Sequence, residues 1–516
     1  MSRSPPEGDG INRSRNVLAN WGGYIFTIVV NFALSPFIVH SLGNTAYGIW
    51  VLLGSIVGYL GLLDLGVRGA VTRFVAKFHT EKNHAEATRV ASSALVIFST
   101  TGLLASAIAG VFAVFIVQFF QIPPELVTVA RVVLILGGLN IGISMVSGVY
   151  GGVVAAMQRF DYINSVEVAV GTIRVVAIVW ALSAGMGLIA LAAIQLGMSF
   201  LRGLASFWLS RRLYPQLLTH FSECRRSQLR LIISFSVSVL LLQASGMLIL
   251  FTDSVVIGAF LPISMVTFFA IAANLTEYAR APITGISQTL TPWASTLEAD
   301  DKQDELQRIV LVGARIATLI ATPILLTFML RGKSFIGLWM GAEYAIPSGD
   351  ILFILSLALW FAVAYQVVVS TMMGISKHSG LVPAFVIEAA CNIILSVIWV
   401  REYGIIGVAW GTTVPRLLAS VIFMPWYVRR VLGITVSKFF YTVWLKPAIA
   451  MVPFGIVSWL IEKWYVADNL VVYFTQVAAA LPVAALGAWV VSLTPEERNR
   501  LVPAGVLRWL AGKIYN

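Results

Sequence analysis

Long apolar runs follow one another along nearly the whole chain, and they limit the fold more than any other feature. A helix needs about 20 apolar residues to cross a bilayer, and runs of this length recur between charged or Gly/Pro-marked breaks. Only 11% of the 516 residues are charged and 58% are hydrophobic, whereas about a quarter of a soluble domain is charged. Two cysteines and five histidines show no disulfide or metal-ligand spacing, so no cofactor is expected. The sequence predicts an all-α polytopic membrane protein.

About 14 of these runs are candidates for membrane-spanning helices. The run at 264–291 is the weakest of them, because Asn274, Glu277 and Arg280 interrupt it. The residues before the first run are polar and contain no signal-peptide core, so we expect the first run to remain as a helix. The predicted spans lie near 17–40, 46–67, 90–117, 126–150, 163–183, 187–209, 231–255, 264–291, 306–330, 347–373, 380–400, 404–428, 443–462 and 468–492.

The distribution of Lys and Arg predicts the orientation, because cytoplasmic loops are enriched in both. With the N-terminus inside, 26 of the 35 Lys and Arg residues fall on the cytoplasmic side and four on the other. Arg202 counts among the 26 as a side chain that reaches back to the cytoplasm, and Arg331 counts among the external four. We therefore expect both termini in the cytoplasm. The net charge of +11 then reflects membrane orientation and not nucleic-acid binding.

Two segments of the chain resemble each other and predict a duplication. Glu167 precedes an apolar stretch that begins at Gly187, and Glu388 precedes a similar stretch that begins at Gly407. The copies lie six spans apart and enter from the same side, which predicts two parallel, pseudo-symmetric six-helix lobes around a central cavity. Chance similarity between glycine-rich segments is the alternative. The predicted parts are a cytoplasmic tail (1–16), an N-lobe (17–209), a basic cytoplasmic linker (210–230), a C-lobe (231–428), two appended C-terminal helices (443–492) and a cytoplasmic amphipathic tail (493–516).

Two kinds of short motif predict local structure. The fourth span carries glycines at 138, 142, 148 and 152, which form two Gly-x-x-x-Gly motifs suited to close helix packing. Near the C-terminus, Thr494 and Glu497 have the spacing of a helix capping box, with a proline between them. The residues that follow alternate as in an interfacial amphipathic helix. An ordered tail that packs on the helix ends is the alternative.

Five arginines lie inside predicted spans. A charge at bilayer depth costs about 3 kcal/mol even on the mildest scale, so it faces either a partner or a wet cavity. Arg131 lies only about one and a half turns from its helix start, and we expect it to reach the interface. We expect the other four to line a substrate cavity, with internal ion pairs as the alternative: Arg174, Arg280, Arg315 and Arg416.

Acidic residues near these arginines define the alternative more closely. Glu167 and Arg174 are seven residues apart on one helix face, so a water or a neighbouring side chain would have to join them. Glu277 and Arg280 are three apart and within direct reach. Such ion pairs either hold the structure together, or line the cavity and separate when substrate binds.

Four acidic residues are candidates for ion coupling or gating. Asp253, in the seventh span, is the foremost candidate to bind H⁺ or Na⁺, since buried acids in spans are usually functional. Glu388 in the eleventh span and Glu167 are further candidates. Asp64 is another, although with Arg68 four residues later it is equally suited to holding a helix end.

Short motifs in both halves resemble a known transporter family. The first half contains Ser41-Leu-Gly43, Tyr47-Gly-Ile-Trp50, Leu63-Asp-Leu-Gly66 and Arg73-Phe-Val-Ala76, and the second contains Thr252-Asp253 and Thr289-Leu-Thr-Pro292. The chain resembles the polysaccharide transporter (O-antigen, or lipid-linked oligosaccharide, flippase) family of the multidrug/oligosaccharidyl-lipid/polysaccharide exporter superfamily. Many relatives have about 12 spans, so 14 is closer to the lipid II flippase branch.

The resemblance implies a flippase of the bacterial cytoplasmic membrane. Its substrate would be an undecaprenyl-diphosphate-linked oligosaccharide that crosses the bilayer by alternating access, with the polysaccharide assembly machinery as a further partner. Arginine suits this substrate because guanidinium groups bind phosphate oxygens bidentately and stay charged. A lipid II flippase is the alternative, and a multidrug exporter, whose cavity should be acidic, is a weaker one. Short external loops and the lack of a paired His/Asp constellation in a span argue against an enzyme.

Overall fold

The computed structural model of the chain describes residues 28–501, apart from the side chains of 233–242 and 499–501. Within these residues every regular element is a helix and no strand occurs. The all-α prediction is therefore confirmed for this part of the chain. The tail at 1–16 and the amphipathic segment after 501 lie outside the described residues.

The predicted number of membrane crossings agrees with the helices observed. Eleven helices of the described part are long and apolar enough to span a membrane, and one of these, His378–Leu432, contains Gly404 with a positive φ of 59°. If that helix is divided at Gly404, the Ile28–Leu42 and Ser264–Ala299 helices complete the predicted 14. Ser264–Ala299 contains two prolines as well as Glu277 and Arg280, which explains its lower hydropathy.

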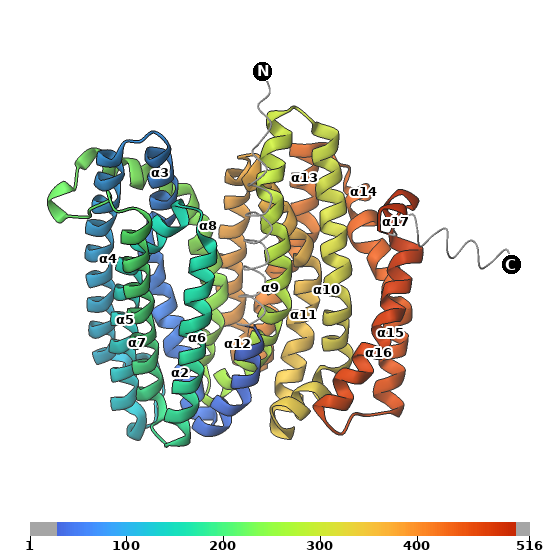
Figure 1. Cartoon of the computed structure of the whole chain (residues 1–516). Coiled ribbons are helices and arrows are strands. Elements are labelled where there is room, and N and C mark those ends of the chain that lie inside the picture. The colour runs from blue at the N-terminus through green and yellow to red at the C-terminus, as the bar shows by residue number, and fades with distance from the viewer. Residues whose placement is uncertain (1–27, 502–516) are drawn as a thin grey trace. The chain divides into compact units, whose positions relative to one another are not determined.

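The helices of the first half are, in chain order, α2 (Asn44–Leu60), α3 (Val67–Thr80), α4 (His84–Phe119), α5 (Val127–Ala156), α6 (Phe160–Ser183), α7 (Gly187–Leu213) and α8 (Arg226–Phe260). Those of the second half are α9 (Ser264–Ala299), α10 (Gln303–Trp339), α11 (Ala342–Gly374), α12 (Val382–Leu418), α13 (Met424–Leu432), α14 (Val436–Phe440), α15 (Lys446–Trp464), α16 (Leu470–Gly487) and α17 (Pro495–Leu501). Figure 1 traces these elements along the chain.

The chain divides into two compact units. The first contains Met1–Ala270 and Phe385–Thr412, and the second contains Ile271–Ala384 and Thr413–Asn516. The hairpin within α12 that ends at Thr412 therefore belongs to the first unit, together with α2 to α8. The six-helix lobe boundaries drawn from the sequence remain a prediction.

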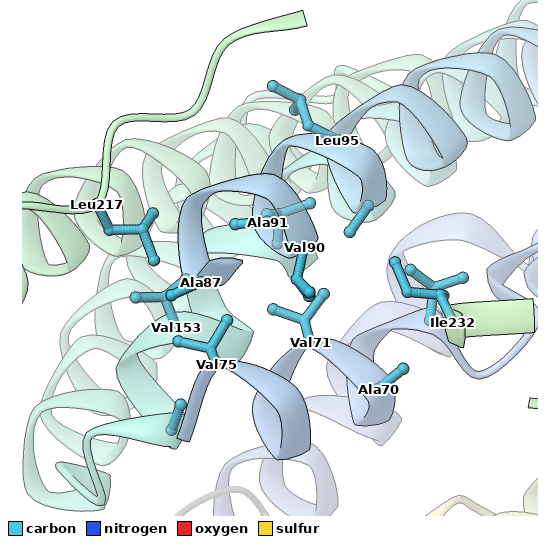
Figure 2. Close-up of a cluster of buried hydrophobic side chains, with 14 of the residues drawn as sticks. Ala70, Val71, Val75, Ala87, Val90, Ala91, Leu95, Val153, Leu217 and Ile232 are labelled. Atoms are coloured by element: carbon cyan, nitrogen blue, oxygen red, sulfur yellow. The ribbon is translucent and has the colours of Figure 1, made fainter. Parts of the chain in front are cut away.

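Helix α3 is the one long helix that the sequence analysis placed in a loop. Its apolar face packs on α4 and α5: Val71 and Val75 lie in one buried cluster with Ala87 and Val90 of α4 and Val153 of α5 (Figure 2). Burying a valine completely contributes about 1.5–3 kcal/mol where the alternative is water. This contact fixes α3 against the end of α5, and with it Arg68 near the start of α3.

The glycines of α5 allow two different close contacts. A Cβ on Gly138 would lie 2.4 Å from the Cβ of Ala109, and Gly142 faces the backbone of Gly102, so the first motif packs on α4. A Cβ on Gly148 would lie 3.0 Å from the Arg68 guanidinium, so the second motif packs on α3. Close packing at both motifs is thus confirmed. At the second motif, Gly148 also leaves room for the Arg68 guanidinium.

In the second unit, α10 carries two buried arginines, Arg315 and Arg331, that bind the C-terminal helices. Arg331 is only 1% exposed, and its Nε donates to Glu462 of α15 at 2.9 Å. It also donates to Gln476 of α16 and lies 4.5 Å from the Tyr473 ring. The sequence placed Arg331 just beyond a predicted span, on the external side; in the structure α10 extends to Trp339 and buries its side chain, and the side of the membrane remains a prediction.

The capping box at the start of α17 is confirmed. The Thr494 N–H donates to Glu497 at 2.8 Å, and the Glu497 N–H donates back to the Thr494 hydroxyl at 3.4 Å. These two bonds satisfy backbone donors that a helix start otherwise leaves open.

Candidate functional site

Arg174 is a predicted site residue with one buried donor that no described residue satisfies. It lies half-buried in α6, and its Nη2 donates to the Asn31 side chain at 3.1 Å. Its Nε is buried and has no acceptor among the described residues. A buried donor without an acceptor costs about 1–3 kcal/mol, more for a charged group. An anionic ligand would supply the missing acceptor.

The proposed link between Glu167 and Arg174 is replaced by a different ion pair. Glu167 accepts from Nη2 of Arg202 at 2.9 Å, and its Oε1 lies 2.8 Å from the Arg202 Nε. Glu167 and Arg174 are about 10 Å apart along the helix axis, whereas α7 brings Arg202 directly alongside. Arg202 is therefore the partner of a membrane acid and not simply a side chain that reaches the cytoplasm.

The other three predicted arginines belong to the second unit. Arg280 donates to Glu277 through Nε and Nη2, the latter at 2.5 Å, as the spacing predicted. Arg315 is 3% exposed and pairs with Glu497 of α17. Arg416 lies half-buried in α12, directly after Pro415. The ion pairs of Arg280 and Arg315 involve different glutamates, so these contacts do not bring the two arginines together.

Asp253 forms the centre of a buried polar cluster in the first unit. The carboxylate is 6% exposed and accepts from the Thr412 hydroxyl, 2.7 Å from Oδ1 and 2.8 Å from Oδ2. Thr412 also accepts from the Asn392 amide at 2.8 Å. The Oδ1 of Asn392 is buried and accepts no hydrogen bond from the described residues. We call Asp253, Asn392 and Thr412 the buried acid cluster.

Glu388 lies one helical turn from this cluster. It is 3% exposed and precedes Asn392 by four residues, which places both on one face of α12. Carboxylate, amide and hydroxyl oxygens are ligands for hard cations, and a buried carboxylate can alternatively take a proton. No group of three or more His, Cys, Asp or Glu side chains in the described part could hold a metal ion. The cluster thus suits an ion bound mainly by neutral oxygens.

The remaining two predicted residues make local contacts. Asp64 lies in a short 3₁₀ turn and faces Arg68, with Oδ2 and Nε 4.0 Å apart. Arg131 is exposed and donates to the Val114 carbonyl of α4 at 3.4 Å. Both contacts are consistent with structural roles at helix ends.

A polar cavity of about 390 Å³ opens between α3, α5, α6 and α7 of the first unit. Arg68, Glu167 and Arg202 line it together with Ser144, Ser147 and Ser206. The sequence analysis identified Glu167 here but not Arg202 or the serines. The signal that could have found Arg202 is its own depth, since a residue about 11 positions before the end of α7 lies about 16 Å from that end.

Residues 14–298 match the family described as polysaccharide biosynthesis protein, more than half of the chain. The chain belongs to this family. The resemblance drawn from the sequence motifs is thereby confirmed. Within the polysaccharide biosynthesis protein family, a Shigella flexneri relative named "Putative O-antigen transporter" is 21% identical over 427 residues, covering 81% of this chain and 98% of its own.

Solved structures share the fold of this polysaccharide biosynthesis protein. The lipid II flippase MurJ in an inward closed conformation has a TM-score of 0.71 at 15% identity, over 92% of this chain and 97% of its own. An inward-facing multidrug resistance MATE family transporter of the MOP superfamily has a TM-score of 0.68 at 16% identity, over 81% and 96%. Because the fold occurs in a flippase and in a multidrug transporter, it does not decide the substrate.

Proposed function

We propose that this protein is a flippase that moves an undecaprenyl-diphosphate-linked oligosaccharide across the bacterial cytoplasmic membrane for surface polysaccharide synthesis. The single observation that carries the proposal is Arg174, a half-buried membrane arginine with an unsatisfied Nε, in a member of a polysaccharide biosynthesis family. A diphosphate offers several anionic oxygens to such a group, and guanidinium binds them bidentately. The proposal includes cytoplasmic termini, alternating access and contact with polysaccharide assembly proteins, and assigns transport without covalent chemistry.

Arg416 and Arg280 are proposed as further substrate-binding residues. Arg280 would exchange Glu277 for phosphate, since this pair has both side chains about two-fifths exposed and such exposed pairs contribute only about 0–1 kcal/mol. Arg315 is the weakest of the four, because removing a buried arginine from its glutamate leaves an uncompensated charge. We propose that Arg315 mainly holds α17.

The buried acid cluster is proposed to bind the coupling ion, H⁺ or Na⁺. The free Oδ1 of Asn392 and the Asp253 carboxylate provide oxygens at a depth where water is scarce. Binding an ion there would favour the conformation in which these oxygens converge, and a substrate that favours the other conformation would then be coupled to it. Asp64 and Glu167 stay as further candidates for gating.

The test is complementation in two bacterial strains, one lacking its surface-polysaccharide flippase and one lacking its lipid II flippase. The proposal predicts rescue of the first strain only, because the family match points to surface polysaccharide. Rescue of the lipid II strain alone would establish the alternative substrate. Failure in both strains, with transport of cationic drugs instead, would replace the proposal with a multidrug exporter.

Substitution of the arginines tests the site separately. Arg174→Ala and Arg416→Ala should abolish glycan export while protein levels stay near those of the wild type. Arg131→Ala is the matched control, since Arg131 is exposed and bonds only a backbone carbonyl in the described contacts. If the two substitutions lower expression and leave export per molecule unchanged, these arginines are structural.

A further inference from the structure

Two hollows of the first unit meet at Ser147, which lines both. One is the polar cavity, and the other is an apolar groove of about 560 Å³ between α4, α5 and α7. The groove is lined mainly by Leu103, Leu139, Ile143, Val146, Phe200 and Leu204. A continuous surface that is polar at one end and apolar at the other suits an amphiphilic ligand.

The polar end offers the donors that bind a phosphate group. The Arg68 guanidinium packs against Gly148 of α5, where any side chain beyond hydrogen would displace it. Its pair with Asp64 is long, at 4.0 Å, and the Arg68 side chain is 55% exposed. Arg202 lies opposite in α7 and is paired with Glu167. Two guanidinium groups and several serine hydroxyls therefore face one small cavity, with Glu167 as the acid that a ligand must tolerate.

The apolar groove owes its depth to glycines and faces the hydrocarbon side of the helices. A Cβ on Gly203 would lie 2.2 Å from the Ser147 hydroxyl, so glycine lets α7 approach α5 where the two hollows meet without displacing this hydroxyl. The rims are exposed: Leu103 is 73% exposed and Phe200 is 54% exposed. An exposed apolar groove on a membrane helix bundle contacts lipid chains and not water.

Helix geometry places the polar end toward the cytoplasm. Ser147 lies nine residues before the end of α5 at Ala156, about 14 Å along the axis, while Leu139 lies about 26 Å from the same end. The predicted orientation puts this end of α5 on the cytoplasmic side. A lipid of the cytoplasmic leaflet has the same disposition, with its phosphate near the surface and its chains toward the midplane.

We propose that the polar cavity and the apolar groove together bind one anionic glycerophospholipid of the cytoplasmic leaflet. Its phosphate would lie between Arg68 and Arg202 and an acyl chain would fill the groove. A cavity of about 390 Å³ is near the lower end of known ligand pockets. Its volume suits a phosphate with a small polar group better than an oligosaccharide of several sugars. The occupant is therefore a bilayer lipid and not the transported substrate, which takes the inference beyond the proposed function.

The test measures lipid binding to the purified full-length protein by native mass spectrometry. Phosphatidylglycerol and phosphatidylcholine with identical acyl chains are titrated against the wild type, Arg68→Gln and Arg202→Gln. Arg73→Gln is the matched control, because Arg73 lies exposed on the same helix as Arg68 and does not line the cavity. We expect one phosphatidylglycerol per chain in the wild type, at least fivefold weaker binding in both test variants, and no change in the control.

A groove variant keeps the test independent of charge. Ile143→Trp fills the apolar groove and should weaken phosphatidylglycerol binding although both arginines remain. If Arg202→Gln does not fold, Arg68→Gln alone tests the role of charge, because the Arg68 side chain is exposed. Equal binding of phosphatidylcholine, or unchanged binding in Arg68→Gln, overturns the proposal. Displacement of phosphatidylglycerol by a polyprenyl-diphosphate-linked sugar overturns it too, and assigns the site to the substrate. Because the assay measures no transport, its failure leaves the flippase proposal standing.

Discussion

Glu167 and Glu388 occupy matching positions in the two repeated segments, yet their surroundings differ. Glu167 is 45% exposed and is neutralised by Arg202 of the next helix. Glu388 is 3% exposed and lies one helical turn before Asn392, which donates to Thr412, the hydrogen-bond partner of Asp253. A carboxylate paired with a fixed arginine has its charge compensated permanently. Asp253, whose described partners are neutral, has no such fixed counter-charge, and we propose that it binds an ion that can arrive and leave.

Glu497, a third carboxylate, shows that partial burial alone does not make a carboxylate a candidate for ion coupling. Glu497 is 17% exposed on its side chain and pairs with Arg315, which is 3% exposed. We therefore expect the Glu497–Arg315 pair to be structural, and we propose the ion site at Asp253, whose described partners are neutral. The following experiments compare these carboxylates, from the largest expected effect to the smallest.

The largest effect is expected for Asp253→Asn. Removing the central carboxylate of the buried acid cluster should lower glycan transport by about 100-fold or more, since even outer-shell changes at ion sites cost 10–100-fold in affinity. Transport into vesicles with imposed Na⁺ or pH gradients measures it. Asp161→Asn is the control, because Asp161 pairs with Arg159 at 2.9 Å outside the cluster. Transport that keeps its full rate and its ion dependence in Asp253→Asn would show that coupling occurs elsewhere.

The matching glutamates should respond unequally to the same substitution. Glu388→Gln should reduce ion-dependent transport about 10-fold, within the range expected for a group close to an ion. Glu167→Gln should change it less than about fivefold, because an exposed ion pair contributes about 0–1 kcal/mol. The assay is the same, normalised to protein level. Equal losses in both variants would mean that the repeat positions share one role.

Glu497→Ala should destabilise the contact between α17 and α10 by about 3 kcal/mol, the cost of leaving a buried charge without its partner. Hydrogen exchange of the α17 and α10 amides measures the local opening. Glu496→Ala is a matched control, since the adjacent glutamate is 79% exposed and lies 3.7 Å from Arg308. It should cost less than about 1 kcal/mol. Similar losses in both variants would show that the Arg315 pair adds nothing.

The smallest effect is a pH dependence of the same contact. Partial burial alone would raise the pKa of Glu497, but the Thr494 N–H and the Arg315 guanidinium outweigh it and lower the pKa below 4.5. A lowered pKa means that the stabilisation is complete above the unfolded value and is lost as the pH falls through the folded value. Exchange protection of α17 should therefore be flat from pH 7 to pH 5 and decline below. In Glu497→Ala this decline in exchange protection should be absent. If the decline persists in that variant, another titrating group causes it.

Local spacing predicted those contacts that lie within one or two helical turns. The Glu277–Arg280 pair, the Thr494–Glu497 capping box and the close packing at Gly138 all follow from a fixed rise and a fixed angle per residue. The number and positions of the membrane helices followed in the same way from the lengths of the apolar runs. Such features need no knowledge of which helices are neighbours.

Partners from distant parts of the chain could not be predicted in this way. Arg202 is 35 residues from Glu167, Thr412 is 159 from Asp253, and Glu497 is 182 from Arg315. The burial of Arg331 could not be predicted for the same reason, since only the packing of α15 and α16 on α10 shows it.

The sequence by itself determined the membrane class, the membrane-spanning helices, the local ion pairs and the family, because hydropathy, helix periodicity and short motifs are properties of adjacent residues. Only the tertiary structure decided which arginine neutralises which carboxylate, and which carboxylates lie among neutral oxygens. The physical reason is that the free energy of a buried charge depends on every group within a few ångströms. In a helix bundle, most of those groups come from other helices.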